Sequence, residues 1–172
     1  LVKFQTFSAD RLVTRKAEKA DYQVKNTGAA ENQHQMLSKL EFSAEMHHEL
    51  VAHCVTRNIG FFSTGFDLES VDFLLDLGIQ HFKVPSGEIT NLPYLRHIGQ
   101  FHRPIILSTG MATLGDIEAA IDVLELAGTL RSLITVLHCT TEYPTPMVEV
   151  NLRAMQSIQR SFGVAVGYSD HT

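Results

Sequence analysis

The sequence has little of what marks secreted or membrane proteins. It contains only two cysteines, Cys54 and Cys139, in segments with helix and strand patterns, which does not resemble a disulfide framework. It has no run of about 18 apolar residues, which excludes a membrane span. Its first residues, Leu1 to Gln5, lack the organisation of a signal peptide. We therefore expect a cytoplasmic protein in a reducing compartment.

An excess of positive charge is also missing. The chain has 14 Lys and Arg against 19 Asp and Glu, a formal net charge of −5, which argues against general nucleic-acid binding. With 44% hydrophobic and 19% charged residues, the composition suffices for a buried core and excludes a disordered chain. We expect one globular domain without interdomain linkers.

Short apolar runs alternate with helical patterns from Phe61 onward. This alternation is typical of βαβ units around a parallel sheet, and strands rich in Val, Ile, Leu and Phe suit burial on both faces. The candidate strands cover residues 2–7, 60–63, 80–84, 104–108, 133–138 and 164–168.

Four helices are predicted from their starts and apolar spacing. They cover 44–58, 68–77, 114–127 and 152–161, with Ser43, Asp67, Thr113 and Asn151 as the respective N-caps. The polar segment 8–41 is predicted to be a long loop with one short helix, and loops of this length usually serve a site.

Polar or small residues follow each candidate strand. In a parallel βα barrel these strand ends meet at one rim, where chemistry occurs. An open doubly wound sheet would also bind ligands at strand ends, but it usually carries a glycine-rich turn, and the chain has no GxGxxG. The pattern therefore favours a (β/α)8 TIM barrel, of which six strands are visible.

The predicted rim is rich in groups that bind anions. Two lysines, several hydroxyls and backbone amides near Gly87 suit a phosphate and a carboxylate: Lys3, Lys83, Thr64, Ser86, Thr141 and Ser169. Each hydroxyl alone could instead cap a following helix. His171, directly after Asp170, could bind a divalent metal, although a single histidine is more often structural.

The histidine string from His47 to His53 is not a zinc motif. The second histidine stands five positions after His48, where HExxH requires four, so the two rings diverge on a helix. We interpret this string as a surface feature. Neither cysteine neighbours an obvious base, so a cysteine nucleophile is not expected.

Five motifs together resemble the N-acetylneuraminate (sialic acid) synthase family, which includes the legionaminic and pseudaminic acid synthases. They are VKFQT at residues 2–6, KVPSGE at 83–88, ILSTGM at 106–111, HCTTEYP at 138–144 and GYSDHT at 167–172. They cover essentially the whole chain, in the expected order and spacing.

The resemblance implies condensation of phosphoenolpyruvate with N-acetylmannosamine or a related 2,4-diacetamido hexose, giving a nonulosonic acid and phosphate. It implies a TIM barrel that holds Mn²⁺ or Mg²⁺ in a homodimer. It also implies that residues 1–172 are part of that barrel, without its first and last strands and without the family's C-terminal antifreeze-like domain.

Site residues follow from the motif positions that match. Phosphoenolpyruvate would be held by Lys3, Thr64, Lys83, Ser86, Thr141, Tyr143 and Ser169, with Gly87 and Asp170 beside them. Gln5, Glu88 and Tyr143 would face the sugar, and His171 matches a metal-binding histidine. Glu88 is the candidate acid or base, because a carboxylate near the reacting carbonyl could move protons.

Two other readings stay open. Lys83 could be the Schiff-base lysine of a class I aldolase barrel that holds pyruvate. The chain could also be a non-catalytic remnant that binds an anion or a sugar without releasing phosphate.

Overall fold

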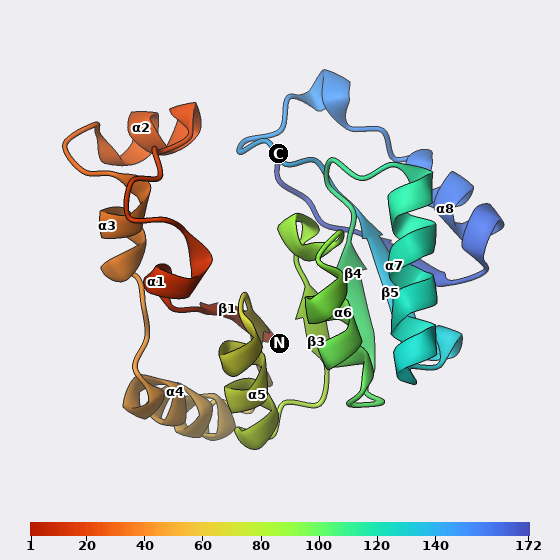
Figure 1. The fold of residues 1–172 in the computed structure, drawn as a ribbon, viewed down its shortest axis with the longest axis horizontal. Coiled ribbons are helices and arrows are strands. Elements are labelled where there is room, and N and C mark those ends of the chain that lie inside the picture. Colours follow the sequence, from red (N-terminus) through yellow and green to blue (C-terminus); the bar gives the residue numbers. More distant parts are fainter. The chain divides into compact units, whose positions relative to one another are not determined.

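The computed structural model describes residues 1–172, which form two compact units, Leu1–Ile79 and Gln80–Thr172 (Figure 1). Each unit combines helices with a parallel sheet, so the predicted α/β class is confirmed. All six predicted strands are present, two in one sheet and four in the other. None of the helices has the length and hydrophobicity needed to cross a bilayer.

The first unit contains a two-stranded parallel sheet. Strand β1 (Val2–Thr6) pairs with β2 (Phe61–Gly65), and Gln5 lies opposite Thr64 in the register. Two predicted helices follow as α4 (Ala44–Thr56) and α5 (Leu68–Asp76). Both begin where their caps predict, because Ser43 and Asp67 accept hydrogen bonds from the backbone amides three residues on.

The polar segment between β1 and α4 holds more helix than predicted. It forms α1 (Ala9–Leu12), α2 (Asp21–Thr27) and α3 (Gln33–Ser38) in place of one short helix. At the start of α3, Asn32 accepts a hydrogen bond from the amide of Gln35, whose side chain accepts one from the amide of Asn32. This reciprocal capping stabilises a helix that has few apolar residues.

His47 corrects the interpretation of the histidine string as surface. Only 1% of this residue is exposed. Its Nδ1 lies 2.8 Å from the carbonyl of Ser43, so Nδ1 carries the proton, and Nε2 accepts a hydrogen bond from Thr6 Oγ1 at 2.8 Å. Thr6 Oγ1 in turn lies 2.7 Å from Ser63 Oγ. The helix α4 is thereby tied to both strands, a contact that helical periodicity does not reveal.

The second unit contains a four-stranded parallel sheet. Its strands are β3 (Phe82–Val84), β4 (Ile105–Ser108), β5 (Ile134–His138) and β6 (Ala165–Tyr168). They lie in the order in which they occur in the chain. A doubly wound sheet reverses its order at a switch point, and this sheet has none. The sequential order is the one that successive βα units of a barrel produce.

Helices α6 (Leu92–Gly99) and α7 (Leu114–Ala127) lie side by side in this unit (Figure 1). A Cβ atom added to Gly99 would lie 2.6 Å from Cβ of Ala127, so glycine permits the close approach of the two helices. Helix α6 was not predicted, although Asn91 caps it and Pro93 stands in its first turn. The fully buried core side chains include Leu95, Ile98, Ile121, Leu124, Ile105, Leu107, Ile134 and Val136.

Helix α8 (Ala154–Phe162) packs on β5 and β6. It begins later than predicted, because Arg153 occupies the N-cap position and makes no side-chain cap hydrogen bond. The prediction that Asn151 caps this helix is therefore wrong. Residues 147–149 form a short 3₁₀ turn before it, which the helical spacing of 152–161 does not anticipate.

Removing the N-cap of α7 is expected to destabilise the protein modestly. Thr113 Oγ1 accepts a hydrogen bond from the amide of Asp116 at 3.2 Å, and the Asp116 carboxylate accepts one from the amide of Thr113 at 2.8 Å. We expect Thr113→Ala to lower the free energy of unfolding by about 1 kcal/mol. Urea denaturation measures this, with Thr56→Ala on the last turn of α4 as the control. Equal losses in the two variants would contradict a specific capping role.

Candidate functional site

Three of the predicted substrate ligands lie in the first unit. Lys3 and Gln5 are two residues apart on β1, and Thr64 is paired with Gln5 on β2, so all three share one face of the sheet. Burial lowers the pKa of the Lys3 ammonium, which an anion placed beside it would counteract. Thr64 is 1% exposed, and its hydroxyl has no hydrogen-bond partner. This face therefore offers a buried hydroxyl and an ammonium to a ligand.

Lys83 lies at the centre of the predicted site in the second unit. It is 9% exposed, and its ammonium donates a hydrogen bond of 2.5 Å to Ser108 Oγ. The contact follows from the register, because Lys83 is paired with Ile106 and Ser108 is two residues further along the same face of β4. A buried ammonium beside a hydroxyl is a strong anchor for an anion.

Ser86 connects the ends of three strands. Its Oγ accepts a hydrogen bond of 3.0 Å from the amide of Gly110 and lies 3.4 Å from Sγ of Cys139. A Cβ atom added to Gly110 would lie 3.0 Å from Ser86 Oγ and 3.2 Å from Thr141 Oγ1. The structure therefore brings two of the predicted ligands, Ser86 and Thr141, together around Gly110.

Glu88 and Gly87 lie with Ser86 in the 3₁₀ turn η1 (Ser86–Glu88), directly after β3. Gly87 is exposed and Glu88 is half-buried. The Glu88 carboxylate accepts a hydrogen bond of 2.6 Å from the side chain of Asn91. This contact fixes the carboxylate at the end of the strand while leaving lone pairs for other donors.

His171 is held by two of its neighbours. Its Nδ1 lies 2.6 Å from the carbonyl oxygen of Thr140, so Nδ1 donates the hydrogen bond and Nε2 keeps a lone pair. Nε2 lies 3.2 Å from Ser169 Oγ, and the ring of Tyr143 lies 4.4 Å from the His171 ring. A backbone carbonyl on one nitrogen is the usual way to orient a metal-binding histidine, so Nε2 is suited to a metal ion.

Other metal ligands are scarce. The chain contains no group of three or more His, Cys, Asp or Glu side chains that could hold a metal ion. Hydrogen bonds from the amide and the hydroxyl of Thr172 lower the pKa of the Asp170 carboxyl, which is exposed. His171 is therefore one oriented ligand, and a complete coordination shell would require further oxygen atoms.

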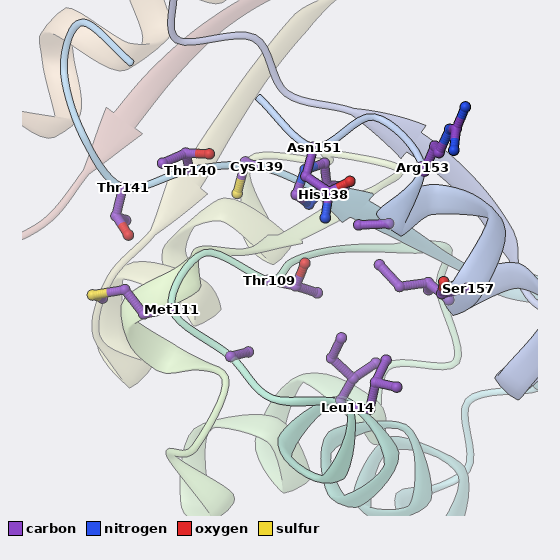
Figure 2. A pocket seen from close by; sticks show the side chains of 14 residues that line it. Thr109, Met111, Leu114, His138, Cys139, Thr140, Thr141, Asn151, Arg153 and Ser157 are labelled. Carbon is purple, nitrogen blue, oxygen red and sulfur yellow. The ribbon is translucent and has the colours of Figure 1, made fainter. Parts of the chain in front are cut away.

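A cavity of about 550 Å³ lies beside Cys139, Thr140 and Thr141 (Figure 2). It is lined by the ends of β4 and β5 and by the first turns of α7 and α8. His138 lines this cavity, and its Nε2 is buried without a hydrogen-bond partner. Burial lowers the pKa of His138, so the folded chain favours the neutral imidazole.

The buried imidazole of His138 predicts a pH dependence of stability. Between the ordinary pKa of histidine, about 6.5, and the lower pKa of His138 in the folded state, the unfolded chain binds more protons at this residue than the folded chain does. The free energy of unfolding should therefore fall as the pH drops below about 6.5, and this residue should add no pH dependence above that value. Urea denaturation at about pH 5.5 and about pH 7.5 measures the difference, which His138→Gln should reduce. An unchanged difference in that variant would contradict the prediction.

Several residues of the site were missed by sequence reasoning. Ser108, the amide of Gly110 and the carbonyl of Thr140 all contact predicted ligands. The strand register could have revealed Ser108, because it lies on the same face as Lys83. No local signal marks the other two, which contribute backbone groups. Whether Lys3, Gln5 and Thr64 of the first unit serve the same ligand as the second unit stays a prediction.

Comparison with known proteins gives the relatives of this chain. The NeuB family matches residues 1–172. The N,N'-diacetyllegionaminic acid synthase of Campylobacter jejuni is 57% identical over 171 residues, which is 99% of this chain and 51% of that protein. The N-acetylneuraminate-9-phosphate synthase of Homo sapiens is 32% identical, over 98% of this chain and 46% of that protein. The chain spans about half the length of the curated relatives it matches.

Solved structures agree with these sequence relatives. The N-acetylneuraminic acid synthetase of Leptospira borgpetersenii, solved with citrate, superposes with a TM-score of 0.81 at 25% identity. The match covers 99% of this chain and 54% of that chain. The two parallel sheets and their helices therefore resemble a sialic acid synthase structure.

Proposed function

Because the chain belongs to the NeuB family, we propose that it takes part in the condensation of phosphoenolpyruvate with an N-acetylated hexosamine, giving a nonulosonic acid and phosphate. Two contacts carry the proposal: the buried Lys83 ammonium donates to Ser108 Oγ, and Ser86 and Thr141 lie around Gly110. A buried ammonium and three hydroxyls at one end of a parallel sheet suit a phosphorylated carboxylate. The relatives with printed synthase names support this reaction class.

The proposal extends to the barrel of which this chain would form a part. We propose that the two sheets are consecutive parts of a (β/α)8 barrel with six of its eight strands in residues 1–172, since the strands keep their chain order within each sheet. The remaining strands and the antifreeze-like domain would lie outside these residues. The working protein would be a cytoplasmic homodimer.

Each predicted ligand has a proposed task. Lys83, Lys3, Ser86, Thr64, Thr141 and Ser169 would hold phosphoenolpyruvate, with the Gly87 amide and Asp170 beside it. Gln5 and Tyr143 would contact the sugar. Glu88 would move a proton at the reacting carbonyl or the attacking water, since its carboxylate lies in the turn that follows β3.

A divalent ion, Mn²⁺ or Mg²⁺, would be held by His171 Nε2 together with ligands from outside these residues. Such an ion polarises a sugar aldehyde when it is bound. The chain's own contribution is orientation, because the Thr140 carbonyl fixes the proton on Nδ1 and keeps Nε2 free of one.

The acceptor is proposed to be a 2,4-diacetamido hexose in preference to N-acetylmannosamine. The support is the 57% identity to a diacetyllegionaminic acid synthase, against 32% to a neuraminate-9-phosphate synthase. Phosphate release from phosphoenolpyruvate with Mn²⁺ and each sugar in turn tests the proposal. Release that requires both substrates supports condensation, and release without any sugar would contradict it.

The class I aldolase hypothesis predicts a different role for Lys83. A Schiff base forms between Lys83 and pyruvate, and borohydride reduces it to a stable adduct that mass spectrometry detects. We expect no adduct at Lys83, because its ammonium is engaged with Ser108 and the proposed reaction uses it as a charge. An adduct would favour the aldolase.

A further inference from the structure

Thr145 is a buried polar residue that has no task in the proposed reaction. It is 4% exposed and lies outside the helices and strands. We propose that Thr145 is a positioning residue, which holds the segment 140–145 against His171 and so keeps Nε2 of His171 directed at a divalent ion. This inference rests on the proposed function, because that function assigns the ion to His171.

Both hydrogen-bond donors of Thr145 are used close to His171. The backbone amide of Thr145 donates to the carbonyl oxygen of His171 at 2.8 Å, and Oγ1 donates to the carbonyl oxygen of Glu142 at 2.9 Å. His171 lies beyond β6, which ends at Tyr168, so the sheet does not hold its main chain. The Thr145 amide therefore fixes the main chain of a residue that lies outside the sheet.

The same segment also holds the imidazole ring of His171. The Thr140 carbonyl lies 2.6 Å from Nδ1 at the edge of the ring. The Tyr143 ring lies against its face, with the ring centroids 4.4 Å apart and the planes at 32°. Together these contacts restrict rotation of the imidazole about its side-chain bonds. They leave the lone pair on Nε2, the nitrogen assigned to the ion.

The Thr145 hydroxyl connects the main-chain contact with the ring contact. Its hydrogen bond to Glu142 spans Tyr143 and Pro144, so it closes the chain on both sides of the Tyr143 ring. Loss of the hydroxyl would remove this closure and leave a carbonyl without that donor. Thr145 therefore acts on Nε2 through Tyr143 and the backbone, without touching the ion.

A purely structural role is the alternative, because buried hydroxyls normally find a partner. Thr129 is a matched example in the same unit. It is 1% exposed, and its Oγ1 donates to the carbonyl oxygen of Gly99 at 3.0 Å. It precedes β5, whereas the segment 140–145 follows β5, so the two threonines lie at opposite ends of that strand. Thr129 thus shows what the loss of such a hydroxyl does away from His171.

Mn²⁺ binding to the full-length enzyme tests the proposal. Titration followed by the electron paramagnetic resonance signal of free Mn²⁺ gives the dissociation constant, and pulsed measurements detect the nitrogen of a bound imidazole. Thr145→Val removes the hydroxyl and keeps the shape of the side chain. We expect the dissociation constant to rise about tenfold and the nitrogen signal to weaken, as for other groups that orient a metal ligand. Thr145→Ser retains the hydroxyl and should restore both.

Two further variants separate positioning from stability. Thr129→Val should lower the thermal midpoint about as much as Thr145→Val and leave the Mn²⁺ dissociation constant unchanged. Tyr143→Leu removes the ring that the Thr145 hydrogen bond holds in place. Tyr143 is 42% exposed, so the fold should tolerate this change, and the dissociation constant should rise as it does in Thr145→Val.

Four results would overturn the role of Thr145: no Mn²⁺ binding to the unchanged enzyme, an unchanged dissociation constant in Thr145→Val or in Tyr143→Leu, an equal rise in Thr129→Val, or no recovery in Thr145→Ser. Phosphate release distinguishes this inference from the proposed function. Weaker Mn²⁺ binding by Thr145→Val, with an unchanged enzyme that releases no phosphate, would refute the synthase and leave the role of Thr145 standing. Unaltered Mn²⁺ binding in that variant, with an unchanged enzyme that does release phosphate, would do the reverse.

Discussion

Replacing Lys83 by glutamine is expected to lower phosphate release from phosphoenolpyruvate about 10³-fold, because one buried donor to a charged group in an active site contributes about this much. The ammonium is buried and lies 2.5 Å from Ser108 Oγ. Glutamine retains a polar end that can bond to Ser108, so the thermal midpoint should change little. Steady-state kinetics with the full-length enzyme measure the loss, and circular dichroism checks the fold.

A matched control shows whether the loss of turnover is specific to Lys83 or follows from replacing any lysine. Lys39 is exposed and pairs with Glu31 on the surface of the first unit. Surface ion pairs contribute little, so Lys39→Gln should leave turnover and stability near their original values. If Lys83→Gln retained turnover within about threefold of the unchanged enzyme, the assignment of the phosphate anchor to Lys83 would be wrong.

Adding a single methyl group at Gly110 is expected to reduce kcat/KM about 10²-fold, since displacements of about 1 Å in an active site have effects of this size. The new Cβ atom would lie 3.0 Å from Ser86 Oγ and 3.1 Å from Thr141 Cγ2. Both side chains would have to move apart, and the amide that donates to Ser86 would move with them. Kinetics of Gly110→Ala with phosphoenolpyruvate as the varied substrate measure the effect.

Gly115→Ala is the control for the glycine substitution. Gly115 lies in the first turn of α7, and the nearest atom to an added Cβ atom would be 3.7 Å away. Alanine is favoured over glycine in helices by about 1 kcal/mol, so this variant should be as active and somewhat more stable. Equal activity of the two variants would show that the contacts around Gly110 do not position a substrate.

Strands β4 and β5 could be predicted from the sequence because each is a short apolar run that the parallel sheet buries. Ile105, Leu107, Ile134 and Val136 are among the least exposed residues of the chain, and such burial requires an apolar sequence. The polar residues that follow the strands were recognisable for the same reason, because the pattern changes abruptly where burial ends. This is how Lys83, Ser86 and His171 could be selected as site residues.

What could not be predicted depends on contacts between distant segments. His47 is polar and belongs to a string of polar residues, yet Phe42, Phe61 and Phe73 surround its ring and Thr6 satisfies Nε2. The start of α8 was also misplaced, because Asn151 has the composition of a cap but lies outside the helix. Tertiary packing determines both the burial of His47 and the start of α8, and the local propensities of the residues do not predict such packing.

The alternation of side chains along β5 restricts how this part of the chain can evolve. Deleting or inserting one residue within the strand would turn Cys139 toward the helices and His138 toward Lys83, exchanging the contents of the two faces. The segment 146–153 is under no such restriction, because it lies outside β5 and α8 and holds none of the proposed substrate ligands. Length variation among natural variants should therefore be concentrated in that loop and absent from the strand.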